Sequence, residues 1–249
     1  ASRGRPESGG LWYRELQLLN WYGLKKQNWI FISLHPHAKI GDKKALASRE
    51  EKEMNRTDSK ISKIAMTGLF AAMSYVVFTF LQFKITLPGG DATSIHLGNA
   101  VCVLGALLLG GVYGGLGGAI GMTIGDLFDP VYVVYAPKTF ILKLCIGLIT
   151  GFLAHRIGKI NESHDQKHIF KWVLIASVGG LLFNVIFDPL VGYYYKLLIL
   201  GKPAAELALV WNVTSTTINA VTSAIASVVI YMPLRNALLR SGMGGILRI

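Results

Sequence analysis

Six apolar stretches, separated by short polar segments, occupy most of the chain after residue 60. An apolar stretch of about 20 residues is long enough to cross a bilayer as a helix. The pattern predicts six helices over residues 64–83, 96–109, 111–128, 138–154, 172–195 and 207–231. The predicted fold class is therefore an all-α integral membrane protein with six transmembrane helices.

Composition supports this class, because 52% of the residues are hydrophobic and only 16% are charged, whereas soluble domains carry about 25% charged residues. Within the predicted bundle, Lys and Arg concentrate in the leading tail, in the loop after the fourth helix and in the C-terminal tail. The opposite side has only Lys84, Lys138, Lys196 and Lys202 near its loops. The positive-inside rule then predicts that both termini are cytoplasmic. The excess of basic residues is explained by their positions beside the predicted helices, and no nucleic-acid partner is needed to explain it.

Residues 1–53 differ in composition from the rest of the chain. They hold three of the five Trp residues and no Met, and Met54 opens a short basic tail that leads into the first apolar stretch. We interpret residues 1–53 as a non-native or mis-assigned leader, and residues 54–249 as the six-helix membrane domain. The alternative is an interfacial helix over residues 11–32, with Trp and Lys at headgroup level.

Polar side chains gather where the predicted helices meet the outer face. Those at comparable depth are His96, Asn99, Asp126, Asp129, Lys138, Asn184, Asp188, Trp211, Asn212 and Asn219. Ionisable groups at membrane depth normally face a bundle interior and mark functional sites. Their shared depth predicts a polar cup open to the outside, although each alone could be a cap or a contact between helices.

Two Phe-Asp-Pro triplets place Asp129 and Asp188 before a proline, a position that disfavours helical geometry, so both are predicted at helix ends. The outer loop over residues 84–95 contains Pro88, Gly89 and Gly90 and is a candidate lid over the cup, with a plain connector as the alternative.

Small residues recur at four-residue spacing in two of the predicted helices. In the third helix they predict close packing against neighbouring helices. In the first helix, Gly68, Ala71 and Ala72 either pack internally or form a flat surface for another membrane protein.

The stretches IHLGNAVCVLGALLLGGVYGGLGGAIGMTIGDL and YAPKTFILKLCIGLITGF, together with the small residues of the first helix, carry a family resemblance. Residues 60–239 resemble the S components of energy-coupling factor (ECF) vitamin transporters, and specifically the hydroxymethylpyrimidine and pyridoxine branch. The resemblance implies a high-affinity vitamin-binding subunit in the bacterial plasma membrane. Its implied partners are a shared transmembrane coupling protein and two ATPases, which use ATP, so that the chain itself carries no cofactor.

The resemblance also implies residue roles. Gly68, Ala71 and Ala72 would form the docking surface for the coupling protein. The implied vitamin contacts are His96, Asn99, Asp126, Lys138, Asn184, Asp188 and Asn219, with Tyr132 or Trp211 stacking on the ring. Pantothenate, thiamine and folate stay open as cargo.

Two other classes of protein compete with this interpretation. A proton-coupled secondary transporter could use Asp126, Asp188 and Lys143 as a relay. An enzyme is not predicted, because the sequence has no Gly-x-Ser-x-Gly elbow and no His-Glu-x-x-His zinc motif. The sequence also has no Walker A loop, so any ATP must be hydrolysed by another subunit.

Overall fold

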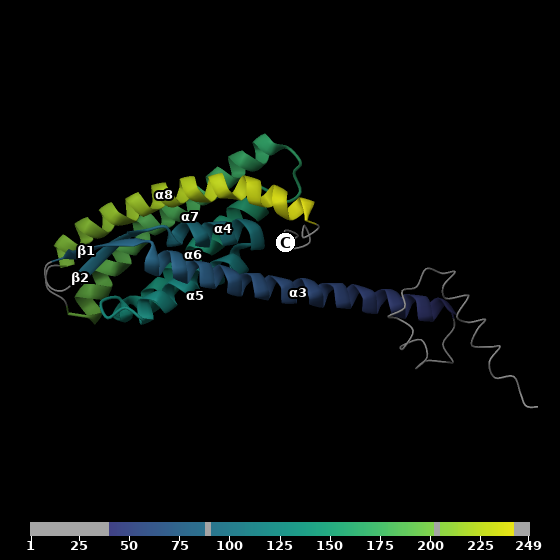
Figure 1. Ribbon diagram of the computed structural model, residues 1–249, viewed down its shortest axis with the longest axis horizontal. Coiled ribbons are helices and arrows are strands. Elements are labelled where there is room, and N and C mark those ends of the chain that lie inside the picture. The colour runs from purple at the N-terminus through teal and green to yellow at the C-terminus, as the bar shows by residue number, and fades with distance from the viewer. Residues whose placement is uncertain (1–39, 88–90, 202–204, 242–249) are drawn as a thin grey trace, which may run out of the picture. The chain divides into compact units, whose positions relative to one another are not determined.

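The computed structural model describes residues 40–87, 91–201 and 205–241 (Figure 1). In chain order the elements are α3 (Ile40–Phe80), β1 (Gln82–Leu87), β2 (Asp91–His96), α4 (Gly98–Leu109), α5 (Gly111–Leu127), η2 (Val133–Tyr135), α6 (Ala136–Gly151), η3 (Phe152–Ile157), α7 (Gln166–Tyr194), η4 (Tyr195–Ile199) and α8 (Ala205–Arg240). Residues 59–249 form a compact unit by themselves, and the helical bundle and the cavity described below lie in that unit.

The predicted leader falls largely outside the described part of the chain. Residues 1–39, which include the alternative interfacial helix, are not among the described residues, and residues 40–53 belong to α3. The interpretation of residues 1–53 as a non-native leader stays a prediction.

Among the described residues, four helical segments are long and apolar enough to cross a membrane: Lys60–Phe80, Val133–Ile157, Gln166–Ile199 and Ala208–Arg240. The first belongs to α3, the second joins η2, α6 and η3, the third joins α7 and η4, and the fourth belongs to α8. By contrast, α4 has 12 residues and is only about 18 Å long. A bilayer core is about 30 Å thick. The structure is thus mostly helical, and six complete spans stay a prediction.

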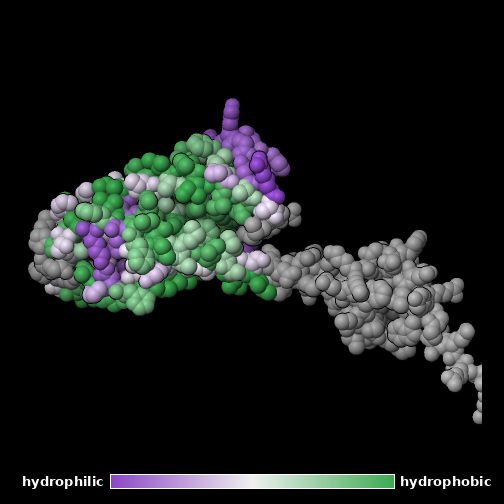
Figure 2. Space-filling model, viewed as in Figure 1, coloured by the Kyte–Doolittle hydropathy of each residue, from purple (hydrophilic) through white to green (hydrophobic). Residues whose placement is uncertain are grey.

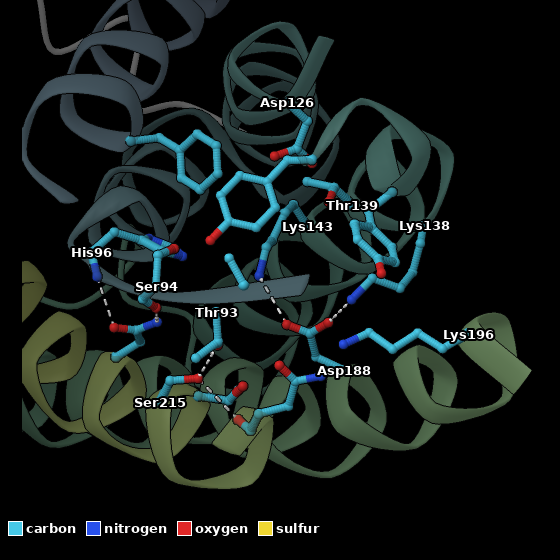
Figure 3. Close-up of a pocket in the computed structure, with 17 residues that line it drawn as sticks. Thr93, Ser94, His96, Asp126, Lys138, Thr139, Lys143, Asp188, Lys196 and Ser215 are labelled. Carbon is cyan, nitrogen blue, oxygen red and sulfur yellow. Dashed lines mark hydrogen bonds and ion pairs between the residues drawn. The ribbon is translucent and has the colours of Figure 1, made fainter. Parts of the chain in front are cut away.

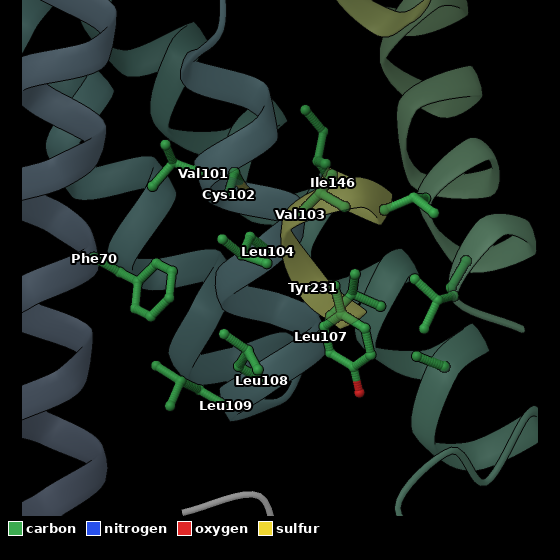
Figure 4. Close-up of a cluster of buried hydrophobic side chains, with 14 of the residues drawn as sticks. Phe70, Val101, Cys102, Val103, Leu104, Leu107, Leu108, Leu109, Ile146 and Tyr231 are labelled. Atoms are coloured by element: carbon green, nitrogen blue, oxygen red, sulfur yellow. The ribbon is translucent and has the colours of Figure 1, made fainter. Parts of the chain in front are cut away.

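The short helix α4 lies at the centre of the bundle, where every one of its residues is buried. Figure 4 shows Leu104, Leu107 and Leu108 of α4 facing Phe70 of α3 and Tyr231 of α8. A helix that is apolar on all sides needs neighbours on all sides. This explains why α4 does not have to reach both membrane surfaces.

Helix α5 packs against α4 and α6 through glycines, as the sequence predicted. A Cβ added to Gly114 would lie 2.0 Å from the carbonyl carbon of Gly105, and one added to Gly147 would lie 2.2 Å from the Cα of Gly115. Backbone therefore meets backbone at both contacts. Small residues allow the backbones of two helices in lipid to approach each other this closely.

The surface of the bundle is mainly hydrophobic. Figure 2 shows apolar residues over the visible helices, with hydrophilic residues gathered toward the end that carries β1 and β2 and toward the opposite end. Exposed apolar side chains on α7 and α8 include Leu182, Ile186, Val221, Ile225 and Val229. A band of this kind suits contact with lipid.

Residues 82–96 depart from the all-α prediction, because β1 and β2 form an antiparallel hairpin in which Gln82 pairs with His96 and Leu87 with Asp91. The first predicted helix consequently ends at Phe80, not at residue 83, and the second begins at Gly98, not at His96. Residues 84–87 alternate between Lys or Thr and apolar side chains, a period of two that suits a strand. The last helix runs nine residues beyond the predicted end at Tyr231, because Pro233 is accommodated inside it.

We predict that Gly114→Ala destabilises the protein and that Gly68→Ala does not. The new methyl group at residue 114 would overlap the backbone of α4, and overpacking of this kind costs about 1–3 kcal/mol. Around Gly68 there is no heavy atom within 4 Å of the added Cβ. Thermal unfolding in detergent measures both variants, and equal melting temperatures for the two would contradict the packing described here.

Candidate functional site

A cavity lies beneath the hairpin, between the ends of α5, α6, α7 and α8 (Figure 3). It offers about 90 Å³ of space for the centres of water molecules. Six of the nine predicted contact residues line it, namely His96, Asp126, Tyr132, Lys138, Asp188 and Asn219. The structure therefore brings together side chains that lie up to 123 positions apart in the sequence. Whether they bind a ligand stays a prediction.

An ion-pair network crosses one end of the cavity. Lys138 of α6 donates a hydrogen bond to Oδ1 of Asp188 on α7. One turn further along α6, the Lys143 ammonium lies 3.6 Å from Oδ2 of Asp188 and donates to Oδ1 of Asn184 at 3.1 Å. Two ammonium groups of α6 thus meet one carboxylate and one amide oxygen of α7, where residues 184 and 188 lie four apart on one helical face.

Asp188 does not lie at a helix end, and this corrects the prediction drawn from the Phe-Asp-Pro triplets. Helix α7 continues through Pro189 to Tyr194. A proline inside a helix removes one backbone hydrogen bond, yet Pro189 is buried and the helix is continuous. Asp129, by contrast, does follow the end of α5.

The hairpin is attached to α8 by hydrogen bonds, two of which involve the side chain of Asn219. Oδ1 of Asn219 accepts from the backbone N–H of His96 at 2.8 Å, and its Nδ2 donates to the carbonyl oxygen of Ser94 at 2.9 Å. The hydroxyls of Thr93 and Ser215 lie 2.6 Å apart beside this pair. The predicted lid is therefore a hairpin fixed to α8, although its tip, residues 88–90, lies outside the described residues.

His96 is a neutral donor toward the cavity. Burial, and secondarily the positive charge of Lys143, lowers the pKa of His96 to about 3. The imidazole is thus uncharged at physiological pH, and its Nδ1 accepts from the backbone N–H of Gly98 at 3.2 Å. The proton of a neutral imidazole must then reside on Nε2.

A second ion pair joins the hairpin to the loop after α5. Lys84 of β1 donates to Oδ2 of Asp129. Partial burial on its own would raise the pKa of Asp129, but the Lys84 ammonium and the N–H groups of Val131 and Tyr132 outweigh it and lower this pKa. Asp129 therefore supports the loop that carries Tyr132 and does not line the cavity.

Three predicted contact residues do not line the cavity: Asn99, Asn184 and Trp211. His96 and Asn99 do not share the helix predicted over residues 96–109, because His96 ends β2 and α4 begins after it. Asn184 is buried behind Lys143 and positions that ammonium. Trp211 is 40% exposed, since it lies on the outward face of α8.

Several residues of the cavity wall were not among the predicted contacts, and they include Lys196, Thr139 and Tyr135. Lys196 lies in η4, which extends α7, and it is buried. The sequence signal that could have identified Lys196 is a lysine within an apolar helical stretch. The sequence analysis instead assigned this lysine to a loop, on the side of the membrane opposite most basic residues.

The predicted docking surface on α3 is divided by the structure. Gly68 and Ala72 are exposed, whereas Ala71 is half-buried against α5, where its carbonyl oxygen lies 2.1 Å from the Cβ that Gly121 would carry. The exposed small surface therefore consists of Gly68 and Ala72, with Ala65 one turn before them. Ala71 packs inside the bundle.

We predict that Asn219→Ala loosens the hairpin. The variant loses two hydrogen bonds, each worth about 0.5–1.5 kcal/mol, so amide exchange at His96 should speed up by about tenfold or more. Hydrogen–deuterium exchange with mass spectrometry measures this. Thr217→Ala is the matched control, because the Thr217 hydroxyl bonds within α8, to Val213. Unchanged protection of residues 91–96 in Asn219→Ala would show that the hairpin is held by other contacts.

Comparison with known proteins identifies the family. The family model described as "ECF-type riboflavin transporter, S component" matches residues 58–236, more than two thirds of the chain. No curated protein and no solved structure matches the chain. S components are vitamin-binding membrane subunits of ECF transporters and are not enzymes. The resemblance noted from the sequence is confirmed at this level, and the chain belongs to the ECF-type riboflavin transporter S component family.

Proposed function

We propose that the cavity beneath the hairpin binds a small heteroaromatic vitamin, with hydroxymethylpyrimidine and pyridoxine as the leading candidates. The observation that carries this proposal is the composition of the cavity wall. Donors and acceptors from six elements (β2, α5, α6, α7, η4 and α8) converge there with the rings of Phe78, Tyr132 and Tyr135. Small-molecule sites combine apolar walls with a few placed polar groups in this manner.

The size of the cavity supports a ligand with a single ring. Each bound water needs about 10–15 Å³ of such space, so the cavity of about 90 Å³ has room for about six to nine waters. This suits one pyridine or pyrimidine ring with its substituents. Riboflavin is the second candidate, because the matching family is described by that vitamin. Its three fused rings and ribityl chain would require the hairpin to move outward.

We further propose that the hairpin end faces outside and that both termini are cytoplasmic. Arg156, Lys159, Lys167 and Lys171 lie in or beside the segment between η3 and α7. This segment lies at the end of the bundle opposite the hairpin (Figure 1). The positive-inside rule assigns that end to the cytoplasm. The cavity would then collect a vitamin from the external medium.

The exposed surface of Gly68 and Ala72 is proposed to dock on a transmembrane coupling protein, which associates with two ATPases. A helix surface without large side chains lets another helix approach closely. ATP would be used by these partners, and the chain itself would need no cofactor. A proton-coupled transporter, the alternative drawn from the sequence, would instead transport without partners.

For the site, we predict that Asp126→Ala weakens vitamin binding at least tenfold and that Trp211→Ala leaves it unchanged. Asp126 is 3% exposed and lines the cavity, whereas Trp211 lies outside it. Removing a partner of a charge-assisted hydrogen bond costs about 1.5–3 kcal/mol. Isothermal titration in detergent should use hydroxymethylpyrimidine, pyridoxine, riboflavin, thiamine, pantothenate and folate. Wild-type affinity in Asp126→Ala would remove this cavity as the site.

For the docking surface, we predict that Gly68→Leu combined with Ala72→Leu spares vitamin binding and abolishes ATP-dependent uptake. Gly68 and Ala72 are both exposed on α3, and a Cβ added at residue 68 meets no heavy atom within 4 Å. Uptake of labelled vitamin into cells that carry the coupling protein and the ATPases measures the effect. Ala71→Leu is the contrasting variant, because it should lower the melting temperature through its contact with α5. Uptake that persists in the double variant, or that follows a proton gradient without the partners, would contradict the proposal.

A further inference from the structure

Asp126 is a buried carboxylate in the wall of the cavity. It comes from the last turn of α5, is 3% exposed and lines the cavity beneath the hairpin (Figure 3). Among the described residues, one side chain donates a hydrogen bond to it, the Thr139 hydroxyl of α6. An ionised carboxylate can accept at about four lone-pair positions. Most of the hydrogen-bonding capacity of Asp126 is therefore open to a ligand in the cavity.

The lysines near Asp126 offset its charge, but their hydrogen bonds go elsewhere. Lys138 donates to Asp188, and Lys143 donates to Asn184. Both ammonium groups act on Asp126 through their charge from a longer distance. In the part of the chain that the structure describes, no ion pair joins an ammonium group to Asp126. Because a buried acceptor without enough donors is unfavourable, a ligand that brings an N–H group gains affinity at this carboxylate.

His96 of β2 presents a hydrogen-bond donor to the same cavity. Its Nδ1 accepts from the backbone N–H of Gly98 at 3.2 Å, and the ring centroid of Phe78 lies 4.8 Å from that of the imidazole, with 85° between the ring planes. These two contacts fix the imidazole, whose proton is on Nε2. Among the described residues, no group accepts from Nε2. The wall thus offers an acceptor on α5 and a donor on β2.

We propose that the cavity selects a vitamin with an aminopyrimidine ring, whose amino group donates to Asp126 and whose opposite ring nitrogen accepts from His96. The inference rests on the proposed vitamin-binding function and narrows its ligand. Carboxylate side chains accept from the amino group of cytosine in the same manner, and such charge-assisted hydrogen bonds are stronger than neutral ones. Of the two leading candidates, hydroxymethylpyrimidine has an amino group with a ring nitrogen directly across the ring, whereas pyridoxine has no amino group. The site therefore favours hydroxymethylpyrimidine.

Matched ligands test this inference on the purified full chain by isothermal titration. In the first analogue of hydroxymethylpyrimidine, a methyl group of similar size replaces the amino group. It should bind about tenfold more weakly or worse, because a hydrogen bond to a charged group corresponds to a decade or more in affinity. In the second analogue, CH replaces the ring nitrogen across from the amino group. It should bind about threefold more weakly or worse, because it loses a neutral hydrogen bond.

Asp126→Asn keeps the shape of the side chain and removes its charge, so the preference for the amino compound over the methyl analogue should fall to about threefold or less. Asp165→Asn is the matched control. Asp165 caps the N-terminus of α7 outside the cavity, and asparagine caps helices equally well, so this variant should keep the full preference. If Asp126→Asn does not fold, the ligands on the unaltered chain still decide the question.

The binding results separate the ligand selectivity from the proposed function. Equal or tighter binding of the methyl analogue, or tighter binding of pyridoxine than of hydroxymethylpyrimidine, would overturn the selection for an amino group and leave vitamin binding standing. A full preference that survives in Asp126→Asn would overturn the assignment to this carboxylate. Equal binding of the second analogue would overturn the role of His96. No binding of any vitamin would overturn the proposed function, and the selectivity with it.

Discussion

The close approach of backbones around α5 is the constraint on which the remaining structure depends. Lipid tails are as apolar as leucine, so helices in a bilayer gain little from burying apolar side chains against each other. Packing instead relies on close contact, and here it occurs at Gly114 against α4 and at Gly147 against α5. Because these contacts bring α4, α5 and α6 together, α4 can be short and completely enclosed.

The short central helix makes room for the site. Where α4 begins at Gly98, the chain before it forms the hairpin, which covers the space that a longer helix would fill. The cavity is walled by the ends of the longer helices and by β2. Its polar groups can be satisfied there by each other, as Asn219 and Asp188 illustrate. A polar cavity is thus placed at the edge of an otherwise apolar bundle.

Much of this arrangement was predictable from the sequence. The helical class, the packing role of the glycines and six of the nine proposed contact residues follow from apolar periodicity, four-residue spacing and shared depth. The apolar periodicity did not reveal the hairpin. Its six-residue strands adjoin apolar helices, so the sequence prediction assigned the ends of these strands to the helices. Depth alone could not tell which face of a helix a residue occupies. Trp211 and Asn212 are adjacent at one depth, yet only Asn212 lines the cavity.

The different positions of Asn184, Asp188 and Lys143 also show that depth does not determine which residues face the cavity. The sequence set Asn184 and Asp188 near one level, but only the structure shows that Asn184 holds Lys143 while Asp188 faces the cavity. An experimentally determined structure of the protein with its tightest-binding vitamin tests the central claim most directly. The account predicts ligand density beneath β2, in contact with Asp126 and Lys138. Density at the opposite end of the bundle, or between α3 and lipid with this cavity empty, would contradict it.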